Sequence, residues 1–151
     1  MPENLRERIT HARIDKSVKI IDERAFNGCI NLLDVETHNG ITKVKRLAFC
    51  DCESLRGIKL LGVREIEECA FQCCTNLTDA EFGKDLERIG GRAFTDCSSL
   101  RRIAIPLNID FPIVNGCRNQ FIYCGKLATV DLVGGIHKTI SSLHFEGWRV
   151  K

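Results

Sequence analysis

The chain has 151 residues, a length that suits one domain with a substantial core. Hydrophobic residues make up 44% and charged residues 28% of the chain, which excludes a disordered or membrane-spanning protein on composition. The 22 basic and 20 acidic residues leave a net charge of +2, which argues against a nucleic-acid-binding protein.

The N-terminal sequence MPENLRERIT is charged from Glu3 onward and has no apolar run, so it predicts no secretory signal peptide. No stretch approaches the roughly 18 apolar residues of a membrane helix, so we expect no membrane partner. Residues 1–8 are expected to form a short, charged N-terminal cap. We therefore expect a cytoplasmic protein whose thiols stay reduced.

A repeat begins near residue 9 and continues to about residue 148. Its clearest mark is an Ala-Phe pair, found at residues 25–26, 48–49, 70–71 and 93–94, with a degenerate copy at 120–121. Each Phe is followed three residues later by Cys, and each Cys three residues later by Leu. The cysteines of this column are Cys29, Cys52, Cys74, Cys97 and Cys124. The repeating unit is (V/I/L)xx(I/V)xxxAFxxCxxLxx(V/I/A), and this fixed period predicts a stacked repeat protein.

A single unit cannot bury its own apolar face, whereas stacked units can. After each Leu the residues alternate, as in Val35, which faces inward between Asp34 and Glu36. Strands are therefore predicted near 10–14, 33–37, 56–60, 78–82, 101–105 and 128–132, each parallel to the next. The Ala-Phe-x-x-Cys segment has helical spacing and is predicted to be a short helix or a 3₁₀ turn.

With AFxxCxxL repeated through nearly the whole chain, the sequence resembles the BspA-like leucine-rich repeats. This resemblance implies an α/β repeat fold, a right-handed solenoid of about six coils in one domain over residues 1–151. One face would be a parallel β-sheet and the other would carry the short helical or 3₁₀ turns. The family occurs in protists and anaerobic bacteria and usually provides recognition or adhesion surfaces. Residues 131–148 look like the end of such arrays in algal proteins, so residues 140–151 are expected to be a truncated last repeat.

Stacking converts the repeat period into columns of neighbouring side chains, and one outward column alternates in charge. The predicted partner-binding residues lie in this column, in a more basic region beside it and in an irregular insertion over residues 106–119: Arg13, Glu36, Arg56, Lys59, Glu81, Arg101, Arg102, Asp131 and Phe111. A second pair of columns alternates between Asp22-Glu23, Lys45-Arg46 and Glu67-Glu68. The alternative interpretation is structural: the charges set the coil register, and the insertion is a plain loop.

The column cysteines are predicted to be buried as small apolar side chains. The alternative is a zinc site drawn from Cys50, Cys52, Cys69, Cys73 and Cys74, although only Cys69-x₃-Cys73 has a suitable spacing. The sequence shows no Ser-His-Asp or Cys-His constellation and no glycine-rich phosphate loop. We therefore expect no cofactor and no enzymatic activity.

These observations favour a non-enzymatic protein–protein interaction module that binds another protein through the strand face of the solenoid. The alternative is a structural, assembly or spacer element of a larger or self-associating protein. End-to-end self-association belongs to this second hypothesis, because the terminal coils of a repeat array present open edges.

Overall fold

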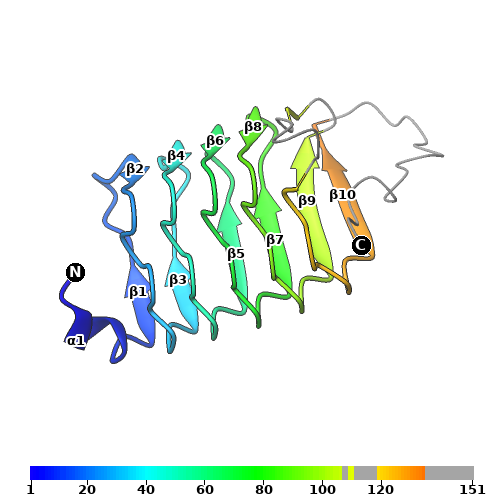
Figure 1. The fold of residues 1–151 in the computed structure, drawn as a ribbon. Coiled ribbons are helices and arrows are strands. Elements are labelled where there is room, and N and C mark those ends of the chain that lie inside the picture. Colours follow the sequence, from blue (N-terminus) through cyan, green and yellow to red (C-terminus); the bar gives the residue numbers. More distant parts are fainter. Residues whose placement is uncertain (107–108, 111–118, 135–151) are drawn as a thin grey trace.

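The structure is a computed structural model, and it describes residues 1–106, 109–110 and 119–134. Successive coils of the chain stack side by side along one axis, with the N-terminus at one end of the stack (Figure 1). One face is formed by six strands: β1 (His11–Arg13), β3 (Asp34–Glu36), β5 (Gly57–Leu60), β7 (Asp79–Phe82), β9 (Arg102–Pro106) and β10 (Thr129–Val133). We call this the strand face. Each of its strands starts one residue after the start predicted from the sequence.

The strands of this face pair in parallel, with β1 beside β3 and with β5, β7, β9 and β10 in consecutive order. The register places Asp34 beside His11 and Arg102 beside Asp79. Inward positions such as Val35 are buried, while their neighbours Asp34 and Glu36 are exposed. The predicted alternation is therefore confirmed, and it puts the charged residues of successive coils next to one another.

The ladder is interrupted between β3 and β5. Here the contacts between the coils include one main-chain hydrogen bond, from Arg56 N to Leu33 O at 3.3 Å, and one from the Thr37 hydroxyl to the Lys59 carbonyl. The reason lies in Thr37, because the equivalent inward residues of other coils are large and apolar, as in Leu60 and Phe82. The half-buried Thr37 does not continue the apolar column. Its hydroxyl, rather than a main-chain N–H, donates to the Lys59 carbonyl.

A second, narrower sheet runs along the stack. It consists of two-residue strands: β2 (Ile20–Ile21), β4 (Lys43–Val44), β6 (Glu65–Ile66) and β8 (Arg88–Ile89). Asp110 continues it beyond β8, because Ile89 N donates to Asp110 O at 3.1 Å and Asp110 N donates to Glu87 O at 2.8 Å. This sheet was not predicted, since a two-residue strand is too short to show alternation.

In the described coils the Ala-Phe segments are tight turns closed by hydrogen bonds across three residues, as in a 3₁₀ turn, rather than short helices. In the first coil, Ala25 N donates to Asp22 O and Cys29 N to Phe26 O, both across three residues. The third residues of these two turns, Arg24 and Gly28, have φ of 56° and 73°, a sign that type II turns require. Phe26 N then points to the next coil and donates to Ala48 O at 2.7 Å. Main-chain bonding between coils thus replaces the bonding within a helix.

Helix α1 (Glu3–Arg6) lies at the N-terminal end of the stack (Figure 1). The Arg6 guanidinium donates to the carbonyls of Arg24 and Asn27 in the first turn segment. No helix among the described residues is long and apolar enough to cross a membrane.

Stacked aromatic rings run through the centre of the array. The Phe of each Ala-Phe or Gln-Phe pair lies over that of the next coil, with centroids 5.0–5.4 Å apart and ring planes within 3–7°. The rings are those of Phe26, Phe49, Phe71, Phe94 and Phe121. Phe82 packs edge-on against Phe71 and Phe94, at 6.4 and 6.0 Å. The repeat period therefore produces one continuous apolar core.

The column cysteines carry a hydrogen bond besides filling space. Four of the five thiols donate to the carbonyl of the Phe one coil earlier, as Cys74 Sγ does to Phe49 O at 3.1 Å and Cys97 Sγ to Phe71 O at 3.1 Å, whereas Cys29 Sγ lies 3.9 Å from Met1 Sδ. Cys52 and Cys124 repeat the contact at 3.1 and 3.0 Å. All eight described cysteines are free, and burial raises the pKa of thiols such as Cys74. The predicted burial of the column is confirmed.

A candidate interaction surface on the strand face

The strand face brings together eight of the nine residues predicted to bind a partner. Arg13, Glu36, Lys59, Glu81 and Asp131 form one outward column across β1, β3, β5, β7 and β10. Arg102 is the first residue of β9, and Arg56 and Arg101 directly precede β5 and β9. The ninth residue, Phe111, lies outside the described residues, as do most of the 106–119 insertion and the whole of 140–151.

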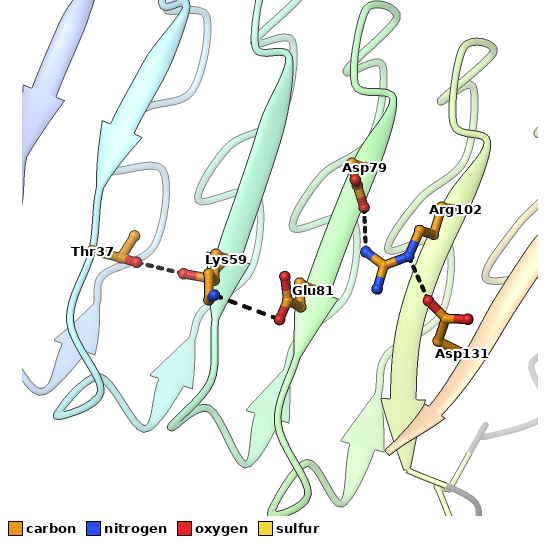
Figure 2. A network of polar contacts seen from close by, with 6 residues as sticks. All are labelled: Thr37, Lys59, Asp79, Glu81, Arg102 and Asp131. Carbon is orange, nitrogen blue, oxygen red and sulfur yellow. Dashed lines mark hydrogen bonds and ion pairs between the residues drawn. The ribbon is translucent and has the colours of Figure 1, made fainter.

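Part of the charge on this face is already paired within the protein (Figure 2). Arg102 lies between two carboxylates, with Nη1 2.8 Å from Asp79 Oδ1 and Nε 2.5 Å from Asp131 Oδ2. These hydrogen bonds to Asp79 and Asp131 raise the pKa of the Arg102 guanidinium. Lys59 Nζ lies 3.6 Å from Glu81 Oε1. Arg102 and Lys59 are therefore the less available basic groups of the face.

Asp79 was missing from the sequence prediction, although the repeat register contains the signal for it. It stands at the same repeat position as Arg102, one coil earlier, so the two side chains are cross-strand neighbours. Asp79 lies in the outward column beside the one that contains Lys59 and Glu81, and the prediction considered only the latter column by its register.

Four of the predicted residues remain exposed and form no ion pair with any described residue: Arg13, Glu36, Arg56 and Arg101. Their charges are solvated in the free protein, so a partner meets them without first breaking an internal pair. The charge available to a partner therefore lies at these four positions.

A shallow, open depression with a volume of about 440 Å³ lies where the strand ladder is interrupted. Charged side chains surround it, among them Asp34, Arg56 and Asp79, and Gly57 lies among its lining residues. Gly57 is the one residue without a side chain at its repeat position, which His11, Asp34, Asp79, Arg102 and Thr129 occupy in the other coils. The missing side chain of Gly57 and the interruption of the ladder between β3 and β5 together hollow the surface here.

A second depression of about 380 Å³ has a more neutral lining of Leu33, Ser54, Asn76 and Thr78. Arg56 lines this depression as well as the first. Arg56 thus belongs to the rim of both.

Charges on the second sheet are largely satisfied between coils. Lys43 Nζ lies 2.7 Å from Glu67 and 3.0 Å from Glu65, and its hydrogen bonds to these two carboxylates raise its pKa. The predicted acidic–basic alternation is confirmed in Lys45–Asp22 at 2.8 Å, Arg46–Glu23 at 3.3 Å and Arg46–Glu68 at 3.9 Å. These charges bind neighbouring coils to one another, which is the structural use expected of them.

The described residues contain no group of three or more His, Cys, Asp or Glu side chains placed to hold a metal ion. The zinc alternative drawn from Cys50, Cys52, Cys69, Cys73 and Cys74 gains no support from their arrangement. Cys50 instead donates to Asp51 Oδ2 at 3.3 Å, and burial raises the pKa of its thiol to about 12. A thiol that stays protonated is a poor nucleophile and a poor metal ligand.

Comparison with solved structures finds two bacterial leucine-rich repeat proteins of this architecture. The T. pallidum leucine-rich repeat protein TpLRR is 25% identical with a TM-score of 0.75, over 83% of this chain and 57% of its own. A leucine-rich repeat protein from Bacteroides ovatus is 25% identical with a TM-score of 0.68, over 82% of this chain and 30% of its own. The chain thus spans about half, or less, of the length of these relatives. Both are bacterial, so the likeness to algal proteins stays a prediction.

No curated protein matches the chain. A family model described as "BspA type Leucine rich repeat region" matches residues 4–128 in six copies. The chain therefore belongs to the BspA-type leucine-rich repeat family.

Proposed function

We propose that the protein is a non-enzymatic interaction module that binds another protein through the strand face. The observation that carries the proposal is a group of four exposed charges beside a depression on the strand face. On the second sheet, Lys43, Lys45 and Arg46 pair with carboxylates of neighbouring coils, although Arg64 and Arg88 do not. On the strand face, Arg13, Glu36, Arg56 and Arg101 are exposed and form no ion pair with the described residues. Exposed charges without an internal ion pair, beside a hollowed surface, suit recognition of a partner. We place this function in the cytoplasm.

The test uses two strand-face variants and one control from the second sheet. Arg13→Glu with Glu36→Lys changes β1 and β3, whereas Arg56→Glu with Arg101→Glu changes the residues that precede β5 and β9. The matched control is Arg64→Glu with Arg88→Glu, two exposed arginines at the second sheet that form no ion pair with described residues. Each variant is used to capture partners from native lysate after circular dichroism has shown that it is folded.

The proposal predicts one protein that is captured by the wild type and by the control but lost by at least one strand-face variant. Capture by both strand-face variants at the wild-type level contradicts it.

End-to-end assembly is a second candidate, because the N-terminal end of the stack presents an incomplete edge. Within the described residues β1 pairs only with β3, and β2 pairs only with β4. Met1, Leu5 and Ile20 are 47%, 42% and 41% exposed near this end. Sedimentation velocity at several concentrations decides this candidate: a rising sedimentation coefficient that Ile20→Lys abolishes supports assembly, and a constant monomer value rules it out.

A further inference from the structure

Residues at equivalent repeat positions form rows that run across the strand face. One of these rows lies just before the N-terminal ends of the strands and has a charge pattern of its own. In the three central coils this row consists of Arg56, Thr78 and Arg101. Main-chain hydrogen bonds join them in sequence, from Thr78 N to Arg56 O at 2.9 Å and from Arg101 N to Thr78 O at 3.0 Å. The two arginines therefore stand two coils apart with a short side chain between them.

Within the strand face of the central coils, these two arginines are the basic side chains that form no ion pair with a described residue. The other two candidates, Lys59 and Arg102, already lie against Glu81, Asp79 and Asp131. Parallel strands lie about 4.8 Å apart, so two steps separate the attachment points of the arginines by about 10 Å. A partner that uses both must present two negative charges at about that distance.

A polyproline II segment meets this requirement. It rises about 3.1 Å per residue with three residues per turn, so residues i and i+3 share one side and stand about 9 Å apart. In an extended β-strand residues i and i+3 point to opposite sides, so the same pair does not reach one surface. The short side chain of Thr78 leaves room between the two arginines for residues i+1 and i+2 of the bound segment. A planar guanidinium pairs with a carboxylate through two parallel hydrogen bonds.

The depression at Gly57 lies beside one end of this row. It is lined by Arg56, and a Cβ at Gly57 would come no closer than 3.6 Å to Asp79 O, so the main chain does not require glycine at this position. Gly57 therefore keeps space open next to Arg56 without serving the backbone. The carboxylates of Asp34, Asp79 and Glu81 also line the depression, so an acidic side chain that binds Arg56 stays at its rim.

We propose that the strand face binds an acidic segment in the polyproline II conformation, with carboxylates at positions i and i+3 on Arg56 and Arg101. This proposal rests on the proposed function and names the chemistry of its partner. The segment crosses the strands over Thr78, and its first acidic residue pairs with Arg56 at the rim of the depression.

The test is an NMR titration of the ¹⁵N-labelled protein that follows the Nε–Hε signals of its arginines. The probe is the capped peptide Pro-Glu-Pro-Pro-Glu-Pro. Control peptides carry Gln in place of both Glu residues, or the two Glu residues two or four positions apart. We expect the probe to shift the signals of Arg56 and Arg101 and to bind at least fivefold more tightly than each control. The signal of Arg102, whose Nε donates to Asp131, should stay in place.

Two protein variants complete the test. Arg101→Gln should weaken binding of the probe at least fivefold and remove the preference for its spacing, whereas the matched control Arg64→Gln should bind as the wild type does. Gly57→Leu should weaken binding by filling the depression. Equal binding of all acidic peptides, equal shifts at Arg64 and Arg56, or no shift at all would overturn the proposal.

Failure of this proposal is distinguishable from failure of the proposed function. A natural partner that is lost by Arg13→Glu with Glu36→Lys, but kept by Arg56→Glu with Arg101→Glu, leaves the strand face as the binding surface. The same result rejects an acidic segment on the two arginines.

Discussion

The thiol of Cys97 donates a hydrogen bond to the main-chain carbonyl of Phe71, one coil earlier, at 3.1 Å. The same carbonyl accepts Cys74 N within its own coil at 3.3 Å. The carbonyl thus accepts two hydrogen bonds, one of which comes from a side chain of the next coil. Cysteine at this position fills a small space in the core and joins adjacent coils.

Replacing Cys97 separates these two roles. Cys97→Ser keeps a donor of nearly the same shape, whereas Cys97→Ala removes the donor and leaves a small cavity. We expect the Ala variant to lose about 2 kcal/mol of unfolding free energy and the Ser variant about 1 kcal/mol, as judged from typical hydrogen-bond and cavity contributions. Urea denaturation followed by circular dichroism measures both. A Ser variant less stable than the Ala variant would show that the thiol acts only as an apolar filler.

Alkaline pH should destabilise the protein through its cysteines. Burial raises the pKa of the thiols, for Cys50 to about 12, above the ordinary value of 9.0. A group with a raised folded pKa contributes its full stability below the unfolded pKa and loses it as the pH rises through the folded one. The unfolding free energy should therefore be flat from about pH 6 to 8. Above about pH 9 it should fall, by about 1.4 kcal/mol per pH unit for each such thiol.

Urea denaturation at a series of pH values, with a reductant present, measures this dependence. The variant Cys50→Ala should show a shallower alkaline slope than the wild type. A stability that is independent of pH up to pH 10.5 would contradict the burial of the thiols.

Two glycines should respond oppositely to the same substitution. Gly57→Ala should raise the unfolding free energy by about 0.5–1 kcal/mol, because its Cβ meets only Asp79 O at 3.6 Å and the unfolded chain loses freedom. Gly83→Ala should destabilise the protein strongly, since its Cβ would lie 2.0 Å from the carbonyl oxygen of Leu61. Thermal unfolding of the two variants side by side measures the difference. A stabilised Gly83→Ala would contradict the close approach of the coils there.

The stacked phenylalanines should differ in their contributions according to position. Phe71 is fully buried between two stacked rings, so Phe71→Ala should cost about 3–5 kcal/mol. Phe26 lies at the end of the stack, is partly exposed and has one stacked neighbour, so Phe26→Ala should cost clearly less. Denaturant unfolding compares them. Equal losses would mean that the first coil is as tightly packed as the central ones.

Much of this fold was predictable because the repeat period places equivalent residues of successive coils next to one another. The period placed Phe49, Cys74 and Val35 in the core, and the strands of the strand face began one residue after their predicted starts. The sequence left a short helix and a 3₁₀ turn both open, because the spacing of Ala-Phe-x-x-Cys suits a helix as well as a pair of turns. Main-chain bonding to the next coil decides between the two, as in Phe49 N to Ala70 O at 2.7 Å, and a single unit does not reveal it.

The position of the candidate surface was predictable from the sequence. Which of its charges are paired within the protein was not. The period placed Lys59 and Arg102 on the strand face, yet their pairing with Glu81, Asp79 and Asp131 depends on side-chain geometry. The depression follows from two departures from the repeat, Thr37 at an inward position and Gly57 at an outward one. Both are visible in the sequence when the coils are aligned column by column.

The most direct test of the strand face as the binding surface is site-specific photo-crosslinking in native extract. A benzophenone amino acid replaces Glu36 on β3 in one protein and Arg64, next to β6, in the other, both exposed positions without an ion pair among the described residues. We expect a single crosslinked partner from position 36 and none from position 64. A partner crosslinked from position 64 alone, or equally from both, would contradict it.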